Sequence, residues 1–380
     1  MKIGIVCYPT FGGSGVVATE LGKALAEKGH EIHFISYNQP VRLEHIKKNI
    51  FYHEVQVTSY PLFEYAPYEL VLSSKLVDVA LNEKLDLLHV HYAIPHASAA
   101  YMAREILKTK GVYVPIITTL HGTDITLVGK DSSFEPVITF AINQSDAVTA
   151  VSESLKQDTF DFFKVTNDIR VISNFICPND YISHGNEELR NKYAKPHERL
   201  VSHISNFREV KRVGDVIKIF AGILKKMDAK LLLVGDGPER RTAEQMCREL
   251  GICNHTLFLG KIRYPEEVLA ISDLFLLPSE TESFGLAALE AMASSVPVIS
   301  TNAGGLPEVN VQGVSGFMSD VGQVDEMAAN AVKILQDDET LNRFSRQAHE
   351  QAMKFDIRNI LPEYEELYEE VVQKQSFSYK

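Results

Sequence analysis

Two glutamates in the stretch SETESFGLAALEAMASS have the residue type and spacing to hold a sugar derivative. Seven residues separate Glu282 from Glu290, and the sequence between them predicts that a helix begins near Phe284 or Gly285. Glu282 then lies in the preceding loop, and Glu290 lies about two turns inside the helix. Carboxylates accept hydrogen bonds from hydroxyl groups, while free amides at the helix start, over 283–286, would hold a phosphate. The pair therefore suits a ligand with a sugar, a diphosphate and a ribose; an amphipathic helix with two solvent-exposed glutamates is the alternative.

Cations that could bind phosphate gather in the stretch SNFREVKR, directly after the apolar run LVSHIS. Arg208, Lys211 and Arg212 lie close together there, in a chain whose net charge is −12. Loops at the carboxyl ends of parallel strands are where α/β proteins bind their ligands. Such cations would stabilise the charge that develops on a diphosphate leaving group. The other interpretation is a solvated charge run with no ligand.

A glycine-rich turn follows the first predicted strand, KIGIVCY, in the stretch PTFGGSGVV. Because Gly12, Gly13 and Gly15 carry no Cβ, backbone amides there could approach an anion or a sugar hydroxyl. The turn lacks the G-x-G-x-x-G spacing of dinucleotide-binding proteins, and the second predicted strand ends in Tyr37 and Asn38 instead of an acidic ribose ligand. A dehydrogenase is therefore disfavoured. An anion site is favoured over a tight turn without a ligand.

Histidines follow two further predicted strands. His121 and Asp124 come after the strand PIITT and could supply a proton donor or a base in a cleft. Three more histidines lie upstream in HVHYAIPHA, at His89, His91 and His96. No carboxylate is spaced to complete a metal site with them, so ordinary packing is expected for His89. Tyr92, just past that strand, is predicted to face a ligand.

Composition narrows the class of protein. The chain has 380 residues, 45% of them hydrophobic, which is too many for one ordinary core and predicts two domains. The net charge of −12 disfavours a nucleic-acid partner. Four scattered cysteines without zinc spacing indicate reduced thiols. No signal-peptide pattern and no apolar run of about 18 residues occurs, so we expect a soluble cytoplasmic protein without stable membrane association.

Short apolar runs alternate with amphipathic stretches along the chain, which predicts an α/β fold with parallel sheets. The alternation pauses between 165 and 200, in a stretch rich in Asn, Pro and charged residues, and then resumes. We therefore expect a first domain over 1–168 and a second over 169–357. The acidic C-terminal helix, over 358–380, is expected either to pack on the surface or to cross back onto the first domain.

Several of these stretches together carry a family resemblance. PSETESFGLAALEAMASSVPVIST followed by NAGGLPEV resembles the E-x7-E motif of the retaining GT-B glycosyltransferases of family 4, and VGDGPER and LFLG match the second domain of that family. GGSGVVATELG, HVHYAIPHA, TTLHGTDITLVG and SNFREVKR are similar to the members that begin bacillithiol assembly. The resemblance covers nearly the whole chain. It implies two Rossmann-like domains facing a cleft, with the acceptor on the first and the nucleotide sugar on the second.

The resemblance also implies roles for the matched positions. Lys211 would bind the donor diphosphate and His121 would face the transferred sugar. Glu282 would contact hydroxyls of that sugar, and Glu290 would contact the ribose of uridine. Further donor contacts are implied at Gly13, Gly235, Ser283, Phe284, Gly285 and Leu286.

One position departs from the family pattern. The usual arginine five residues before the lysine is Asn206 here. Arg208 would either replace its charge or meet a carboxylate of the acceptor, and it is grouped with His121, Lys211 and Glu282 as catalytic. Further acceptor contacts are implied at Ser14, Tyr92, Thr119 and Asn174.

The implied reaction moves N-acetylglucosamine from UDP-N-acetylglucosamine to the hydroxyl of L-malate with retention of configuration. The UDP phosphate would receive the acceptor's proton, and no metal or other cofactor is expected. Two other enzymatic functions stay open: a retaining UDP- or GDP-sugar transferase with a different acceptor, and a UDP-sugar 2-epimerase. A noncatalytic nucleotide-sugar sensor is a third, while a membrane-surface mannosyltransferase is disfavoured because no basic amphipathic helix stands out. The sequence leaves open whether the chain forms a homo-oligomer.

Overall fold

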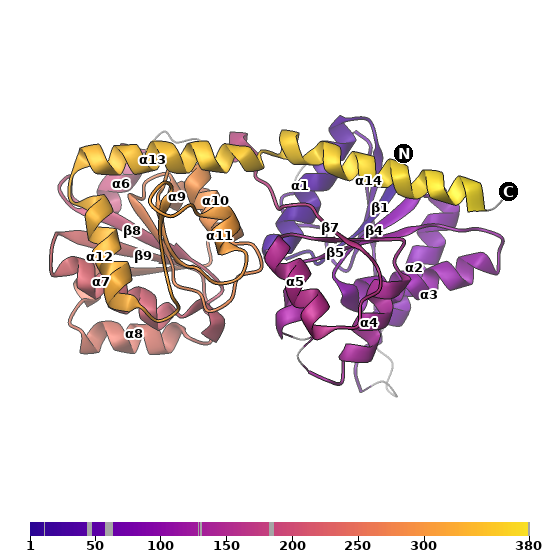
Figure 1. Cartoon of the computed structure of the whole chain (residues 1–380), viewed down its shortest axis with the longest axis horizontal. Coiled ribbons are helices and arrows are strands. Elements are labelled where there is room, and N and C mark those ends of the chain that lie inside the picture. Colours follow the sequence, from indigo (N-terminus) through magenta and orange to yellow (C-terminus); the bar gives the residue numbers. More distant parts are fainter. Residues whose placement is uncertain are drawn as a thin grey trace. The chain divides into compact units, whose positions relative to one another are not determined.

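A computed structural model describes residues 1–10, 12–43, 48–57, 64–127, 129, 131–181 and 186–378. The chain divides into two compact units (Figure 1). Unit 1 comprises Met1–Asn174 and Ile357–Lys380, and unit 2 comprises Phe175–Asp356. Each unit is built around one parallel sheet covered by helices, so the predicted α/β class is confirmed. Among the described residues, no helix has the length and apolar character needed to cross a membrane.

The sheet of unit 1 has seven strands in the order β3-β2-β1-β4-β5-β6-β7. Their bounds are β1 Lys2–Val6, β2 Glu31–Ser36, β3 Ile50–Glu54, β4 Leu87–His91, β5 Ile116–Leu120, β6 Ala147–Ala150 and β7 Ile169–Val171. The central strands β4 and β5 are buried along their whole length, as expected for strands covered on both faces. The order in which strands are added reverses between β1 and β4: β2 and β3 lie on one side of β1, and β4 to β7 lie on the other. Loops that follow these two strands are therefore the place to look for a ligand site.

Helices and two short π-helical turns connect the strands of unit 1. The helices are α1 Gly13–Glu27, α2 Tyr68–Glu83, α3 Ser98–Lys108, α4 Glu135–Gln144 and α5 Glu153–Phe162, and the turns are Ala93–Ala97 and Thr123–Leu127. Apolar side chains of α2 and α3 pack on one face of the sheet, including Leu72, Leu76 and Ala103. Ser152 caps α5 by accepting a hydrogen bond from the amide of Leu155.

The C-terminal helix α14, Ile357–Ser378, belongs to unit 1 (Figure 1). Tyr364 and Tyr368, which belong to this helix, are fully buried. The Tyr368 hydroxyl lies 2.7 Å from Nδ1 of His89, and Glu370 pairs with Arg170 at 2.8 Å. Of the two expectations for this helix, these contacts confirm that it crosses back onto the first domain.

The sheet of unit 2 has six strands in the order β10-β9-β8-β11-β12-β13. The strands are β8 Arg199–Ile204, β9 Ala229–Val234, β10 Thr256–Gly260, β11 Leu274–Leu277, β12 Val298–Thr301 and β13 Gly316–Ser319. The helices are α6 Glu187–Tyr193, α7 Val213–Leu224, α8 Arg240–Glu249, α9 Glu266–Leu269, α10 Leu286–Ala293, α11 Leu306–Val309, α12 Val324–Leu335 and α13 Asp338–Ala352. A buried core that includes Val201, Phe220 and Leu231 fills one face of this sheet. In this sheet the order in which strands are added reverses between β8 and β11.

Candidate active site

The loops after β8 and β11 lie side by side where the strand order of unit 2 reverses. The amide of Glu280 donates to the carbonyl of Val210 over 2.8 Å, which joins the two loops. Across this junction Nζ of Lys211 lies 2.6 Å from Oε1 of Glu282, and the same oxygen accepts from the Ser279 hydroxyl at 2.8 Å. The Lys211 side chain is 21% exposed and that of Glu282 is 12% exposed. The two predicted catalytic groups therefore form one partly buried ion pair that still reaches solvent.

The loop after β12 fixes the backbone of Glu282. The amide of Gly305 donates to the Glu282 carbonyl over 2.8 Å. Gly304 has a φ of +59°, and a Cβ there would lie 2.0 Å from the same carbonyl oxygen. Only glycine tolerates both conditions. The sequence NAGG is thus needed to hold the loop that presents Glu282.

Helix α10 begins at Leu286, one or two residues later than the sequence predicted. The predicted position of Glu290 was wrong for this reason: it is the fifth helical residue, just over one turn inside the helix and not two. The start is displaced because Gly285 has a φ of +97° and ends the preceding loop in a left-handed conformation. Oε1 of Glu290 accepts a hydrogen bond from the Tyr181 hydroxyl at 3.1 Å.

The residues just before α10 differ in what they can offer. The Phe284 side chain is 2% exposed and packs edge to face on Phe355, with ring centroids 5.6 Å apart. Only its backbone can contact a ligand. Ser283 and Leu286 are half-buried. In this stretch, the groups that can contact the donor are therefore the backbone groups at the helix start and the side chains of Ser283 and Leu286.

The two arginines near Lys211 have different surroundings. Nη2 of Arg212 lies 2.6 Å from Asp215 in the first turn of α7. Arg208 is exposed, and within the described part of the chain its guanidinium has no hydrogen-bond or ion-pair partner. Asn206 is also exposed. Arg208 is therefore the arginine of this stretch whose charge is available to an anion.

Gly235 is placed by close contact between the loops after β8 and β9. It has a φ of +121°, and a Cβ at this position would lie 1.8 Å from the Ser205 carbonyl oxygen. The structure therefore gives Gly235 a packing reason to be glycine. Its predicted contact with the donor stays a prediction.

In unit 1, two predicted acceptor residues meet at the reversal between β1 and β4. The Tyr92 hydroxyl donates to Oγ of Ser14 over 2.7 Å. Burial raises the pKa of the Tyr92 phenol to about 12, so it is a neutral donor. Gly15 packs closely against the backbone of Thr10: a Cβ on Gly15 would lie 2.5 Å from the carbonyl oxygen of Thr10. The exposed Gly13 lies beside Ser14 at the start of α1.

His121 lies close to this pair and is neutral. Its Nε2 and Nδ1 of the fully buried His91 are joined by a 2.7 Å hydrogen bond, and the centroid of its ring lies 5.2 Å from that of Tyr92. Burial, with a smaller effect from His96, lowers the pKa of His121 to about 3. At neutral pH it can accept or donate a hydrogen bond but carries no charge.

Asp124 connects the loops that follow β4 and β5. Its carboxylate accepts from the amide of Ala93 at 2.8 Å and from that of Gly122 at 3.2 Å. Burial raises the pKa of Asp124 to about 6, although these amides oppose the rise. Both carboxylate oxygens are used within the fold, so Asp124 holds the loop that carries His121.

The two remaining acceptor predictions lie in different surroundings. Thr119 is fully buried, and its hydroxyl lies 2.7 Å from both Nε2 of His89 and Oγ1 of Thr149. The Thr119 hydroxyl is therefore already used in hydrogen bonds inside the sheet. Asn174 is 6% exposed, and its Oδ1 has no hydrogen-bond partner among the described residues. Asn174 is thus the better placed of the two to bind a polar ligand.

Sequence reasoning gave no site role to Ser279, Tyr181 or His91, which contact Glu282, Glu290 and His121. Tyr181 is 109 positions from Glu290, and no local pattern links them. Ser279 lies three residues before Glu282, and this spacing was the one available signal.

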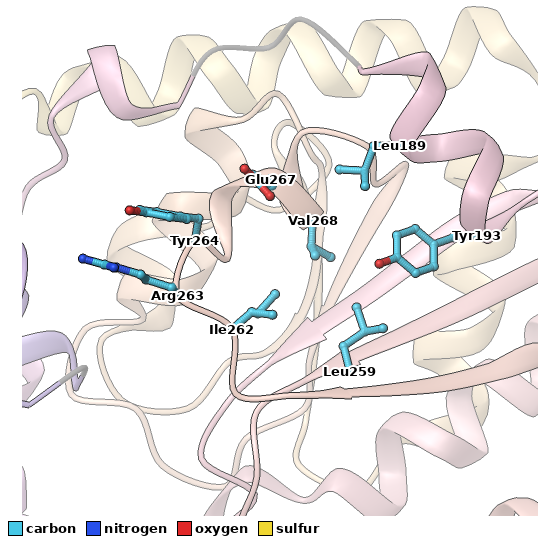
Figure 2. A pocket seen from close by; sticks show the side chains of 8 residues that line it. All are labelled: Leu189, Tyr193, Leu259, Ile262, Arg263, Tyr264, Glu267 and Val268. Carbon is cyan, nitrogen blue, oxygen red and sulfur yellow. The ribbon is translucent and has the colours of Figure 1, made fainter.

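Figure 2 shows a separate pocket of about 230 Å³ in unit 2. It lies between α6, the segment after β10 and α9, and its wall includes Leu189, Leu259, Ile262 and Val268. None of the residues predicted for the transferase site lines it. The wall of the pocket is mainly apolar, and its polar side chains are Tyr193, Arg263, Tyr264 and Glu267.

Comparisons with known proteins agree with the two-unit architecture. Residues 11–180 match the model described as Glycosyltransferase Family 4, and residues 185–351 match the model described as Glycosyl transferases group 1. Anabaena HepE, solved with UDP and glucose, has a TM-score of 0.80 at 23% identity, covering 97% of this chain and 99% of that chain. Sucrose-phosphate synthase from Thermosynechococcus elongatus has a TM-score of 0.80 at 19% identity, covering 100% of both chains. The fold is thus that of the GT-B glycosyltransferases.

A curated relative takes the assignment further. N-acetyl-alpha-D-glucosaminyl L-malate synthase of Bacillus anthracis is 49% identical over 374 residues, which is 98% of this chain and 97% of that protein. The chain belongs to glycosyltransferase family 4, and it is an enzyme of the transferase class.

Proposed function

We propose that this enzyme transfers N-acetylglucosamine from UDP-N-acetylglucosamine to the hydroxyl of L-malate, with retention of configuration. The product is N-acetyl-α-D-glucosaminyl L-malate, and the step is the first of bacillithiol biosynthesis. The observation that carries this proposal is the 49% identity to the Bacillus anthracis malate synthase over 98% of the chain. The pairing of Lys211 with Glu282 and that of Tyr92 with Ser14 are consistent with it.

Unit 2 is the proposed donor-binding unit. The Lys211 ammonium has three donor hydrogens, and Glu282 accepts one of them at 2.6 Å. The other two are available for the diphosphate, where a fixed cation stabilises the leaving group. Glu282 accepts hydrogen bonds from hydroxyls of the transferred sugar. Glu290, held by the Tyr181 hydroxyl, accepts from the ribose hydroxyls.

Unit 1 is the proposed acceptor-binding unit. Ser14, Tyr92 and Asn174 offer neutral donors and acceptors for the malate hydroxyl and carboxylates, and neutral His121 orients the transferred sugar. A dicarboxylate also needs a positive charge. We assign that role to Arg208, whose guanidinium has no ion-pair partner among the described residues.

The reaction forms one bond and breaks one bond at the anomeric carbon. The malate hydroxyl oxygen attacks the face from which the phosphate departs, the bond from carbon to the phosphate oxygen breaks, and the hydroxyl proton passes to the released UDP. Lys211 supplies the positive charge at the leaving diphosphate, so no divalent cation is needed for this step. A loss of transfer in EDTA that magnesium restores would contradict this mechanism.

The test is UDP release from UDP-N-acetylglucosamine with and without L-malate, in EDTA. Release that depends on malate supports the proposal, and Glu282→Gln should abolish most of it. Release without malate, accompanied by an epimerised donor, would instead support a UDP-sugar 2-epimerase. Binding of UDP with no turnover would support a nucleotide-sugar sensor.

The role of Arg208 has its own test. Arg208→Ala should raise the Michaelis constant for malate and leave UDP affinity unchanged. Arg241→Ala is the matched control, because Arg241 is an exposed arginine of the same unit on α8. Weaker UDP binding with an unchanged Michaelis constant for malate would move Arg208 to the donor phosphate.

We also propose that the enzyme works in the cytoplasm. UDP-N-acetylglucosamine and malate are both anions, which do not cross an apolar bilayer unaided. Cys7 and Cys247 are buried thiols outside any disulfide, as expected in a reducing compartment.

A further inference from the structure

Two histidines and a carboxylate converge at the edge of the unit 1 sheet, away from the residues of the proposed transferase site. His33 lies on β2, His53 lies on the edge strand β3, and Glu83 is the last residue of α2. One ligand atom from each of the three lies within 4.8 Å of the others. We propose that these side chains form a zinc-binding site that ties β2 and β3 to the end of α2.

The parallel register brings the two imidazoles onto one face of the sheet. His33 is opposite Phe51, and His53 is opposite Ile35, so the two histidines are diagonal neighbours on the same face. Ile35 shares a buried cluster with Leu76 and Val79 of α2, which shows that this face is the one that α2 covers. The third ligand, Glu83, therefore comes from the helix that already packs there.

The nitrogens are almost at the separation that zinc requires. Nδ1 of His33 lies 2.9 Å from Nε2 of His53. Two imidazoles bound to tetrahedral zinc at about 2.0–2.1 Å have their nitrogens roughly 3.3 Å apart. Separating the nitrogens by a few tenths of an ångström and turning both rings toward the ion would bring this pair to zinc-binding geometry.

A second carboxylate fixes the tautomer that a ligand needs. Oε1 of Glu31 lies 3.1 Å from Nε2 of His33, and Lys2 holds the same carboxylate at 2.7 Å. The pairing of Glu31 with Lys2 keeps the carboxylate ionised, so Nε2 of His33 must donate the hydrogen bond. In the neutral ring Nδ1 then carries the lone pair that faces His53. This is the carboxylate–histidine–metal arrangement of many zinc sites.

Charge and ligand type favour zinc over other common cations. Glu83 ends α2, where the negative end of the helix dipole favours a cation. The ring of Phe51 stacks on the fully buried His33 with centroids 4.9 Å apart, which shields one side from water. Two imidazoles and one carboxylate suit Zn²⁺ with water as the fourth ligand, whereas Ca²⁺ and Mg²⁺ prefer oxygen ligands.

The test is zinc affinity of the full chain, measured by competition with a chromogenic chelator after EDTA treatment and dialysis. The wild type should bind one Zn²⁺ per chain. His53→Gln and Glu83→Gln should each weaken binding by roughly ten-fold or more, and Glu31→Gln by ~10–100-fold. Both ligand positions are only half-buried, so these variants should fold, which circular dichroism verifies.

His197→Gln is the matched control. His197 is 61% exposed and lies 3.8 Å from one carboxylate, that of Asp228, but has no role in the site. Its variant should bind zinc as the wild type does. Replacing Zn²⁺ by Co²⁺ should give a tetrahedral visible spectrum in the wild type that is lost in His53→Gln. Equal affinity in all variants, or no binding by the wild type, would show that the two histidines form only a hydrogen bond.

Discussion

Acidification should destabilise unit 1 more than unit 2, because unit 1 buries more neutral histidines. Burial lowers the pKa of His89 to about 3, of His96 to about 4 and of His121 to about 3, all in unit 1. Burial also lowers the pKa of the fully buried His91, in the same unit, well below its usual value. In unit 2, burial lowers the pKa of His203 to about 4. An unfolded histidine titrates near about 6.5. Below that pH the unfolded chain binds protons that the folded chain does not, so stability falls until the folded pKa is reached.

The size of the effect follows from these pKa values. Between about pH 7.5 and about pH 5, each such histidine lowers the free energy of unfolding by about 2 kcal/mol, at about 1.4 kcal/mol per pH unit. The three in unit 1 together give about 6 kcal/mol. Asp124 acts in the opposite direction. Because its pKa is raised to about 6, the folded state binds a proton at a higher pH than the unfolded chain does, and the free energy of unfolding rises by about 1.4 kcal/mol. Unit 1 should lose at least about 4–5 kcal/mol, because His91 adds to the loss, and unit 2 should lose about 2 kcal/mol.

Hydrogen–deuterium exchange with peptide resolution can separate the units. Protection of β4 and β5 reports on unit 1, and protection of β8 and β9 reports on unit 2, after correction for the intrinsic exchange rate at each pH. His197→Gln serves as control, because this exposed histidine should not alter the pH dependence. A loss in unit 2 equal to or larger than that in unit 1 would refute the argument from buried histidines.

Three further predictions concern single side chains. Lys211→Met should lower kcat/KM by roughly 100-fold, because the leaving group loses its cation, and unchanged steady-state rates would exclude that role. Glu290→Gln should raise the Michaelis constant for UDP-N-acetylglucosamine about ten-fold, and the matched Tyr181→Phe should raise it less; the reverse order would contradict the ribose assignment. Tyr368→Phe should lower the free energy of unfolding by about 1–3 kcal/mol in urea titrations, because His89 loses a buried partner, and an unchanged midpoint would show that the bond contributes nothing.

Much of the fold and part of the site could be predicted from local sequence. Apolar runs such as LLHVH and IITTL are buried over their whole length, and this property marks strands inside a parallel sheet. Because ligand loops follow such strands, Lys211 and Glu282 could both be placed at strand ends, and the structure brings them to 2.6 Å. The residue types in the loop after β8 and in the loop after β11 were enough to place these two side chains.

Other features depend on contacts that no local pattern encodes. The Tyr92 and Ser14 hydroxyls meet across 78 positions, and Tyr181 meets Glu290 across 109. The hydrophobic pattern could not show that Gly285 is left-handed, which moves the start of α10 and leaves Glu290 just over one turn inside it. It also could not show that the Thr119 hydroxyl points into a hydrogen-bonded layer of the sheet.

The proposed activity is tested most directly by the structure of its product. The purified enzyme would be incubated with UDP-N-acetylglucosamine and L-malate in EDTA, and the product would be examined by proton NMR. The account predicts an α-linked N-acetylglucosaminyl group on the malate hydroxyl, formed in equal amount with UDP. A β-linked product, or consumption of the donor with no glycoside of malate, would contradict it.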